Sequence, residues 1–324
     1  MPYKVAFIGL GVMGHRMLGN MHKHEAFNLF GGWDPDASAR EETKAQYPGL
    51  EIADTPDDLI ARPETDVVYI ASPPASHREH VSKAIAAGKT VFCEKPLGVD
   101  VADSRAMVED VERSGILNAV NFPFARGVAA DYIVGELAAG GPGKVMGADL
   151  RLHFLSWPRD WQANAAPWLS RRAEGGFTRE VVSHYVYLTE RLFGKAELLA
   201  SHAHYPDGPN GEAAETHLLA QLRCGDVPVS IAASVGSTGP DLVEYTVWGS
   251  RRSYRIFDWN QLFSTDGGPW ERGLAHITDP REEGYRRMLD NFQAQLDGRP
   301  HTMASFAQAL SVQELIEAML ASVT

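Results

Sequence analysis

A glycine-rich turn near the start of the chain limits its fold more than any other feature. The apolar run Val5 to Ile8 predicts a buried strand, and the G-x-G-x-x-G sequence at residues 9–14 follows it directly. Glycines at this spacing allow a tight turn, let the backbone approach a pyrophosphate, and let the next helix pack close to the strand. The N-terminus of that helix then faces the anion. The segment therefore predicts a dinucleotide-binding site made by Gly9, Gly11, Val12, Met13 and Gly14.

The next predicted strand, Asn28 to Trp33, ends at an acidic residue, Asp34. A carboxylate at this position accepts hydrogen bonds from the ribose hydroxyls and repels a 2′-phosphate, which favours NAD over NADP. The same side chain could instead cap the helix predicted at residues 37–47. Because Ser38 and Arg40 lie close by in the sequence, NADP stays open as the cofactor.

A lysine followed by a proline ends another predicted strand. The apolar run Val91 to Cys93 is typical of a parallel strand that is covered on both faces. Lys95 then lies at the carboxyl end of the strand, where open α/β sheets bind ligands. Proline removes a backbone donor, fixes φ and makes a cis bond possible, so Pro96 could hold Lys95 in one orientation over a cleft. The alternative is a surface lysine at a strand-to-loop turn.

Polar residues also gather after the apolar strand predicted at Val67 to Ala71, in the run Ser72-Pro73-Pro74-Ala75-Ser76-His77. Leu117 to Asn121 predicts a further strand. Strands that alternate with helices predict a doubly wound parallel sheet, because crossover connections join parallel strands. The fold class is therefore α/β, with an N-terminal Rossmann domain at residues 1–122.

The pattern changes after residue 122. The alternation of strands with helices gives way to a run of strand-like segments, and several of them alternate apolar and polar residues, which is typical of an antiparallel sheet. These segments are residues 144–154, 196–205, 215–223, 229–235, 243–248 and 253–259. Two late helices are predicted at residues 281–296 and about 305–320. We therefore expect a C-terminal α+β domain at residues 123–324, with a large, mostly antiparallel open sheet and a last helix that packs back on the first domain.

Length and charge exclude several classes of protein. A chain of 324 residues exceeds the usual single core, which predicts two domains. The formal net charge of −12 argues against a nucleic acid or an anionic membrane as partner. Two cysteines are too few for a disulfide framework. Neither a signal-peptide pattern nor an apolar run long enough to cross a bilayer is present, so we expect a cytoplasmic protein.

These motifs resemble those of the glucose-fructose oxidoreductase, inositol dehydrogenase and rhizopine-catabolism (Gfo/Idh/MocA) family. The likeness rests on the glycines of residues 9–14, on the run at residues 72–77, and on Gly88-Lys89 leading to Glu94-Lys95-Pro96. It implies that Lys95 contacts the substrate and the nicotinamide ribose. It also implies that the two prolines and the histidine line the nicotinamide pocket. Cofactor binding is therefore expected of Asp34, Ser72, Pro73, Pro74, His77, Glu94 and Lys95 as well.

The segment Glu174 to His184 is similar to a second family motif, a glycine run followed by an aspartate and, four residues later, a histidine. Glu180 occupies the aspartate position, and an i, i+4 pair projects from one helix face. We therefore predict that Lys95, His184 and Glu180 are catalytic, with His184 as the general base. A helix-surface ion pair is the alternative. Glu180, Val182 and Tyr187 depart from the family pattern, which leaves the substrate open.

The predicted substrate-binding residues are Trp157, Trp161, Arg179 and Tyr187. The two tryptophans flank Arg159 and Asp160, and flat aromatic faces beside hydrogen-bonding groups suit a sugar ring. Core packing or a subunit contact is the alternative for each tryptophan. His202 and His204 project to one side of a predicted strand but lack a third ligand, so we expect no metal site.

The resemblance implies an NAD(P)-dependent oxidoreductase that transfers hydride between a secondary alcohol and the nicotinamide. The expected substrate is a small polyol-like molecule: a sugar, a sugar acid or a cyclitol. Two other functions remain open, namely NAD-assisted cleavage of a glycoside and a non-catalytic regulator that senses NAD and a sugar. Because the family often associates through the outer face of its second sheet, a homodimer or homotetramer is expected.

Overall fold

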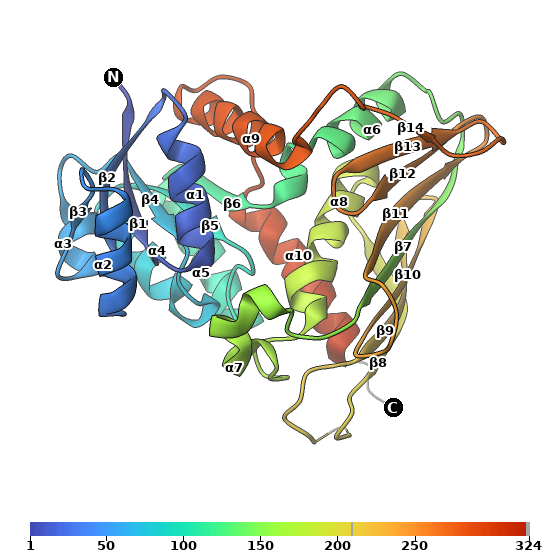
Figure 1. Ribbon diagram of the computed structural model, residues 1–324, viewed down its shortest axis with the longest axis horizontal. Coiled ribbons are helices and arrows are strands. Elements are labelled where there is room, and N and C mark those ends of the chain that lie inside the picture. Colours follow the sequence, from blue (N-terminus) through green and yellow to red (C-terminus); the bar gives the residue numbers. More distant parts are fainter. Residues whose placement is uncertain (209, 322–324) are drawn as a thin grey trace. The chain divides into compact units, whose positions relative to one another are not determined.

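A six-stranded parallel sheet is the core of the first part of the chain in the computed structural model, which describes residues 1–208 and 210–321 (Figure 1). Pro209 and residues 322–324, all within the predicted second domain, lie outside the described residues. The strand order is β3-β2-β1-β4-β5-β6, and every neighbouring pair is parallel. The strands are β1 (Tyr3–Ile8), β2 (Phe27–Trp33), β3 (Glu51–Ile52), β4 (Val67–Ile70), β5 (Thr90–Glu94) and β6 (Asn118–Asn121). This order confirms the predicted doubly wound sheet.

Helices connect these strands, as the crossover pattern predicts. They are α1 (Val12–His22), α2 (Ala37–Gln46), α3 (Pro56–Ala61), η1 (Pro74–Ser76), α4 (His77–Ala86) and α5 (Val101–Ser114). Local chemistry explains their limits. The Asp100 side chain accepts a hydrogen bond from the Asp103 N–H at 2.8 Å and begins α5, and Gly115, at a φ of 72°, ends it.

A late helix, α9 (Pro280–Leu296), completes this core. The ring of Phe292 lies 5.9 Å from the ring of Phe27 and 4.7 Å from that of Phe92. Beyond the helix, Ala304 forms an isolated bridge with Val120 of β6. Residues Met1–Phe122 and Tyr285–Leu310 therefore make one compact unit.

The second unit comprises Pro123–Gly284 and the segment that begins at Ser311. Its eight-stranded sheet has the order β14-β13-β12-β11-β7-β10-β9-β8, and only β7 and β10 pair in parallel. The strands are β7 (Val145–Phe154), β8 (Glu197–His204), β9 (His217–Cys224), β10 (Val227–Val235), β11 (Leu242–Gly249), β12 (Ser253–Phe257), β13 (Gln261–Thr265) and β14 (Glu271–Arg272). The mostly antiparallel sheet is confirmed, but the predicted strand at residues 253–259 ends two residues early.

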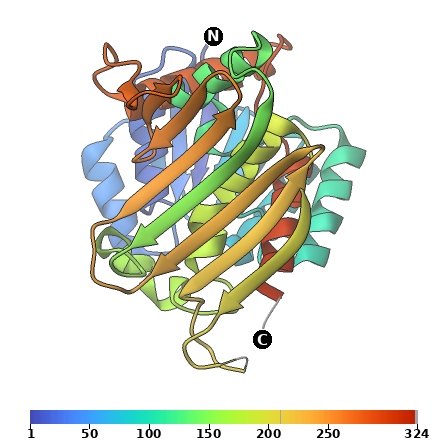
Figure 2. The same cartoon turned by 90° about the vertical axis from the view of Figure 1, so that its right-hand side faces the viewer.

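The helical elements of the second unit are η2 (Pro123–Ala125), α6 (Val128–Ala138), η3 (Asp160–Ala165), α7 (Ala166–Leu169), η4 (Thr178–Val182), α8 (Ser183–Phe193) and α10 (Phe306–Ala321). The predicted last helix is thus present, and its residues through Leu310 fall in the first unit. Figure 2 shows one face of the eight-stranded sheet turned to the viewer, with α8 of the same unit behind the sheet. Along β9 every second residue is exposed, as expected for a sheet with one open face. Within residues 1–208 and 210–321, no helix is long and apolar enough to cross a membrane.

Candidate functional site

The glycine turn after β1 fits a bound pyrophosphate. Gly9 has a φ of 99°, and a Cβ added there would lie 2.6 Å from Ala71; one added at Gly14 would lie 2.1 Å from the Gly9 carbonyl. Packing alone therefore requires these two glycines. Gly11 differs, because its φ of −75° suits any residue and no atom lies within 4 Å of an added Cβ. The absence of a side chain at Gly11 leaves space that a closely approaching phosphate would fill.

Asp34 supports this turn from the end of β2. Its Oδ2 accepts a hydrogen bond from the Leu10 N–H at 2.7 Å, and its Oδ1 accepts one from the Asp36 N–H at 2.9 Å. The alternative reading of Asp34 as a helix cap is wrong, because Asp36 caps α2 by accepting from the Ser38 N–H. Arg40 donates to the Asp34 carbonyl at 2.6 Å. The preference for NAD over NADP remains a prediction.

Lys95 follows a fully buried polar cluster at the end of β5. Glu94 is 5% exposed, and its Oε1 accepts hydrogen bonds from the Tyr69 hydroxyl and from Asn121 Nδ2, the latter at 2.7 Å. Burial raises the pKa of the Glu94 carboxyl. The Lys95–Pro96 peptide bond is cis, as the sequence allows. The hydrogen bonds of Glu94 anchor the residue before Lys95 to β4 and β6.

His77 joins this turn to the one after β4. Its Nε2 lies 2.9 Å from the Ser72 carbonyl oxygen and its Nδ1 lies 3.2 Å from the Leu97 carbonyl oxygen. The ring is completely buried, and burial lowers its pKa. Pro73 precedes η1, and Pro74 begins it as a buried residue. These contacts fix the loops at the carboxyl ends of β4 and β5, and the predicted contact of His77 with the nicotinamide stays a prediction.

In the second unit, two glycines fix the start of η4. A Cβ at Gly175 would lie 2.3 Å from the Leu169 carbonyl oxygen, and one at Gly176 would lie 2.4 Å from Glu215 Oε2. Glu215 is 1% exposed and accepts a hydrogen bond from the Thr178 N–H at 2.8 Å. Burial raises the pKa of Glu215. A buried carboxyl thus caps η4 from the segment before β9.

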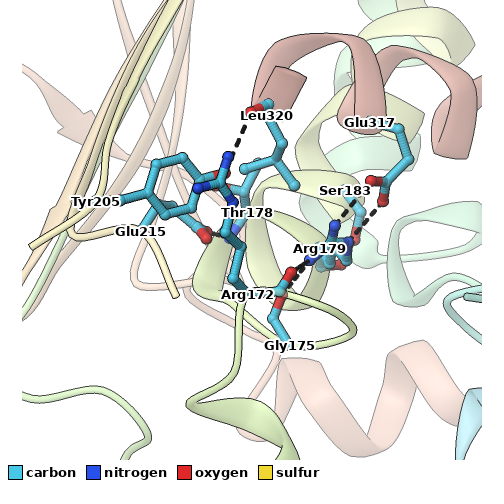
Figure 3. Close-up of polar contacts among 9 residues, drawn as sticks. All are labelled: Arg172, Gly175, Thr178, Arg179, Ser183, Tyr205, Glu215, Glu317 and Leu320. Carbon is cyan, nitrogen blue, oxygen red and sulfur yellow. Dashed lines mark hydrogen bonds and ion pairs between the residues drawn. The ribbon is translucent and has the colours of Figure 1, made fainter. Parts of the chain in front are cut away.

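Arg179 clamps η4 to the last helix, as Figure 3 shows. Its Nε and Nη2 donate to the two carboxylate oxygens of Glu317 at 2.6 and 2.8 Å. Its Nη1 donates at 2.7 Å to the carbonyls of Arg172 and Gly175. These contacts use four of the five N–H groups of the guanidinium. Substrate binding by Arg179 remains a prediction, whereas its contact with Glu317 is a feature that the sequence motifs did not indicate.

Glu180 and His184 lie on consecutive helical segments rather than on one regular α-helix. Glu180 is within η4, a π-helical turn, and His184 is in the first turn of α8. Turns of this kind are rare and are frequent at functional sites. His184 is 8% exposed and meets the rings of Phe124 and Trp259 nearly edge-on, with centroids 6.5 and 6.2 Å away. Burial raises the pKa of Tyr187 to about 12.

Four aromatic rings surround the Arg159 guanidinium. Its central carbon lies 4.7 Å from the ring centre of Phe154, 4.9 Å from Trp161, 5.7 Å from Trp259 and 5.9 Å from Trp157. The predicted substrate-binding tryptophans Trp157 and Trp161 therefore hold a cation between them. Trp259 is a residue that the motifs missed, because it lies in a hairpin turn far from them. Among the described residues, no group of three His, Cys, Asp or Glu side chains could hold a metal ion.

The glycine turn and the parallel sheet define an NAD-binding Rossmann protein. Residues 3–122 match the family model described as "Oxidoreductase family, NAD-binding Rossmann fold". Over these residues, about a third of the chain, the protein is similar to the Gfo/Idh/MocA oxidoreductase family.

A curated relative and two solved structures show the extent of the likeness. The inositol 2-dehydrogenase of Gluconacetobacter diazotrophicus is 37% identical over 123 residues, which cover 36% of this chain and 36% of that protein. The match thus spans about a third of the relative's length. The NAD binding oxidoreductase of Klebsiella pneumoniae has a TM-score of 0.84 at 19% identity, and covers 99% of this chain and 97% of its own. An oxidoreductase of Thermotoga maritima has a TM-score of 0.83 at 17% identity, and the match covers 99% of this chain and 97% of that protein. At these identities the structures share the fold.

Proposed function

We propose that this protein is an NAD(P)-dependent oxidoreductase that acts on the CH–OH group of a sugar, a sugar acid or a cyclitol. One observation carries the proposal: the open space at Gly11 and the fixed turn at Lys95 follow β1 and β5 of one parallel sheet. The carboxyl ends of parallel strands share one edge, where such sheets bind ligands. The name of the inositol 2-dehydrogenase relative supports a polyol substrate.

NAD, when bound, supplies the hydride acceptor or donor. The protein supplies position and a route for the proton. Lys95 donates a hydrogen bond to the reacting oxygen, which orients it and stabilises the negative charge that develops there. The Glu94 cluster and the His77 bridge keep the backbone at Lys95 in place.

His184 accepts the hydroxyl proton as the alcohol is oxidised. An imidazole has an unperturbed pKa of about 6.5, so it takes up and releases a proton near neutral pH. Tyr187 is a poorer base, because burial raises its pKa to about 12. Glu180, one helical turn before His184, orients the imidazole or stabilises its charged form.

The open face of the eight-stranded sheet is the proposed contact between subunits of a homodimer or homotetramer. Leu219 on β9 is 58% exposed on this face, and Trp248 on β11 is 38% exposed. Light scattering after size-exclusion chromatography checks the assembly. A protein that stays monomeric at micromolar concentration contradicts it.

The function is tested by mixing the protein with NAD or NADP and a panel of sugars, sugar acids and inositols, and following reduced nicotinamide by absorbance. We expect turnover with at least one polyol. Lys95→Met should keep most cofactor affinity and lower turnover by orders of magnitude. If the panel gives no turnover but a polyol changes the binding of a protein partner, the protein is a sensor instead of an enzyme.

A further inference from the structure

The four rings around Arg159 come from two separate parts of the second unit. Phe154 ends β7, Trp157 and Trp161 follow it, and Trp259 lies in the turn between β12 and β13. Cation–π contacts of this kind occur about once per 70–80 residues, so four on one guanidinium are a concentrated arrangement. Aromatic faces attract a cation without neutralising it. The rings therefore keep a positive charge in a partly apolar setting.

The turn that carries Trp259 is strained. Asp258 has a φ of 44° and Trp259 a φ of 68°, a left-handed conformation that residues with a Cβ rarely adopt. Strain of this kind persists where the surrounding structure imposes it, often at ligand sites. The Asp258 carboxylate is exposed and accepts from Gln261 Nε2 at 3.3 Å. The indole of Trp259 packs inside the unit, with its ring centre 5.9 Å from that of Tyr185.

Trp259 places the cation beside the proposed base. The ring centre of Trp259 lies 5.7 Å from the Arg159 guanidinium carbon and 6.2 Å from the ring centre of His184. Tyr185 lies near both Arg159 and the Asp258 carboxylate of this turn: burial raises the pKa of its hydroxyl, Asp258 raises it further, and Arg159 lowers it. Arg159 and His184 therefore face the same group of aromatic side chains.

The guanidinium is oriented as well as held. Arg159 Nε lies 3.3 Å from Gln162 Oε1, and the Arg159 backbone N–H donates to the same oxygen at 3.2 Å. A guanidinium with a fixed plane matches the two oxygens of a carboxylate, because its parallel N–H groups form two hydrogen bonds at once. Two neighbouring hydroxyls of a neutral polyol can also accept from these N–H groups, but only a carboxylate adds an opposite charge, which makes the hydrogen bonds roughly twice as strong.

We propose that Arg159 determines substrate specificity by binding a carboxylate, so that the substrate of the proposed reaction is a sugar acid rather than a neutral sugar or a cyclitol. This inference rests on the proposed function. The tryptophans then serve mainly to hold Arg159, and the carboxylate of the substrate fixes which carbon reaches His184.

Matched substrate pairs test the inference. Steady-state KM and kcat are measured for D-glucuronate against D-glucose, D-galacturonate against D-galactose, and D-gluconate against D-sorbitol. The wild type should prefer the acid of a pair. Arg159→Gln should raise KM for the acid on the order of 10- to 100-fold, the range for a lost charge-assisted hydrogen bond, and leave KM for the neutral partner nearly unchanged. Arg159→Lys keeps the positive charge but loses the two parallel N–H groups, so its KM for the acid should lie between those of the wild type and Arg159→Gln.

Arg113→Gln is the matched control. Arg113 lies on α5 of the first unit, is 71% exposed and pairs with Asp110 at 2.7 Å, so its loss should leave both KM values unchanged. If Arg159→Gln raises KM equally for the acid and the neutral partner, or if the wild type prefers neutral substrates, the inference is wrong and the proposed function stands.

A binding measurement separates this inference from the proposed function. Three of the rings are tryptophans, so D-glucuronate bound at Arg159 should change the tryptophan fluorescence of the NAD-loaded wild type at concentrations where D-glucose does not. The change should be absent in Arg159→Gln. Equal responses to both sugars contradict a carboxylate site, even if no compound in the panel is turned over.

Discussion

Replacing Glu317 with glutamine removes the charge that holds Arg179, and with it the anchor of η4. The Arg179 side chain is 11% exposed and that of Glu317 is 25% exposed. Breaking a buried ion pair by removing one partner typically costs about 3–5 kcal/mol, because the other charge is left uncompensated. Here Arg179 keeps two carbonyl partners and the pair is partly exposed. We therefore expect a loss of about 2 kcal/mol in the free energy of unfolding of the second unit.

Urea unfolding followed by tryptophan fluorescence measures this loss, because Trp33 is the one tryptophan outside the second unit. Glu197→Gln is the control, since its pair with Arg223 is more than half exposed on both sides and should contribute less than about 1 kcal/mol. Turnover should also fall in Glu317→Gln, because η4 carries Glu180. Equal losses in the two variants would show that the Arg179–Glu317 pair does not stabilise η4.

Three further outcomes are expected. Gly11→Ala should weaken NAD binding by roughly tenfold or more without changing the unfolding midpoint, because the added methyl enters open space, and calorimetric titration with NAD that shows unchanged affinity contradicts the pyrophosphate site. Asp34→Ala should narrow the gap between the affinities for NAD and NADP, and a wild type that prefers NADP in the same titration contradicts the ribose assignment. Burial raises the pKa of Glu215 above its ordinary value of 4.5, so the stability it contributes is present below about pH 4.5 and is lost as the pH rises through the folded pKa. The free energy of unfolding of Glu215→Gln should therefore depend less on pH above pH 4.5 than that of the wild type. Urea unfolding at a series of pH values measures this, and parallel plots of the free energy against pH for the two proteins contradict it.

The Rossmann unit follows from local patterns in the sequence. Continuous apolar runs predict β1, β4 and β5, and the glycine spacing predicts the turn into α1, because each pattern is contained in a few neighbouring residues. The strand β3 has two residues and no apolar run, so no pattern locates it. The packing of Phe292 against Phe27 is a contact between distant parts of the chain, which periodicity does not encode.

The candidate site could be predicted only where its motifs are continuous. Lys95 and His184 lie in recognisable segments, whereas Glu317 is 138 positions from Arg179 and carries no motif. Trp259 has a left-handed conformation that turn chemistry does not predict for a bulky residue, although its neighbour Asp258 is of a type that tolerates it. The π-helical turn at η4 likewise breaks the regular spacing on which the Glu180 and His184 prediction was based.

The pH dependence of alcohol oxidation in the wild type and in His184→Asn shows whether His184 is the general base. With a substrate from the panel, kcat/KM of the wild type should rise with pH through one ionisation, because His184 must be neutral to accept the proton. His184→Asn should lower kcat/KM by about 10²- to 10⁴-fold and lose that rise. Tyr187→Phe should keep it, since the pKa of Tyr187 is about 12. If His184→Asn retains both the rate and the pH dependence, His184 is not the base and the account of the site is contradicted.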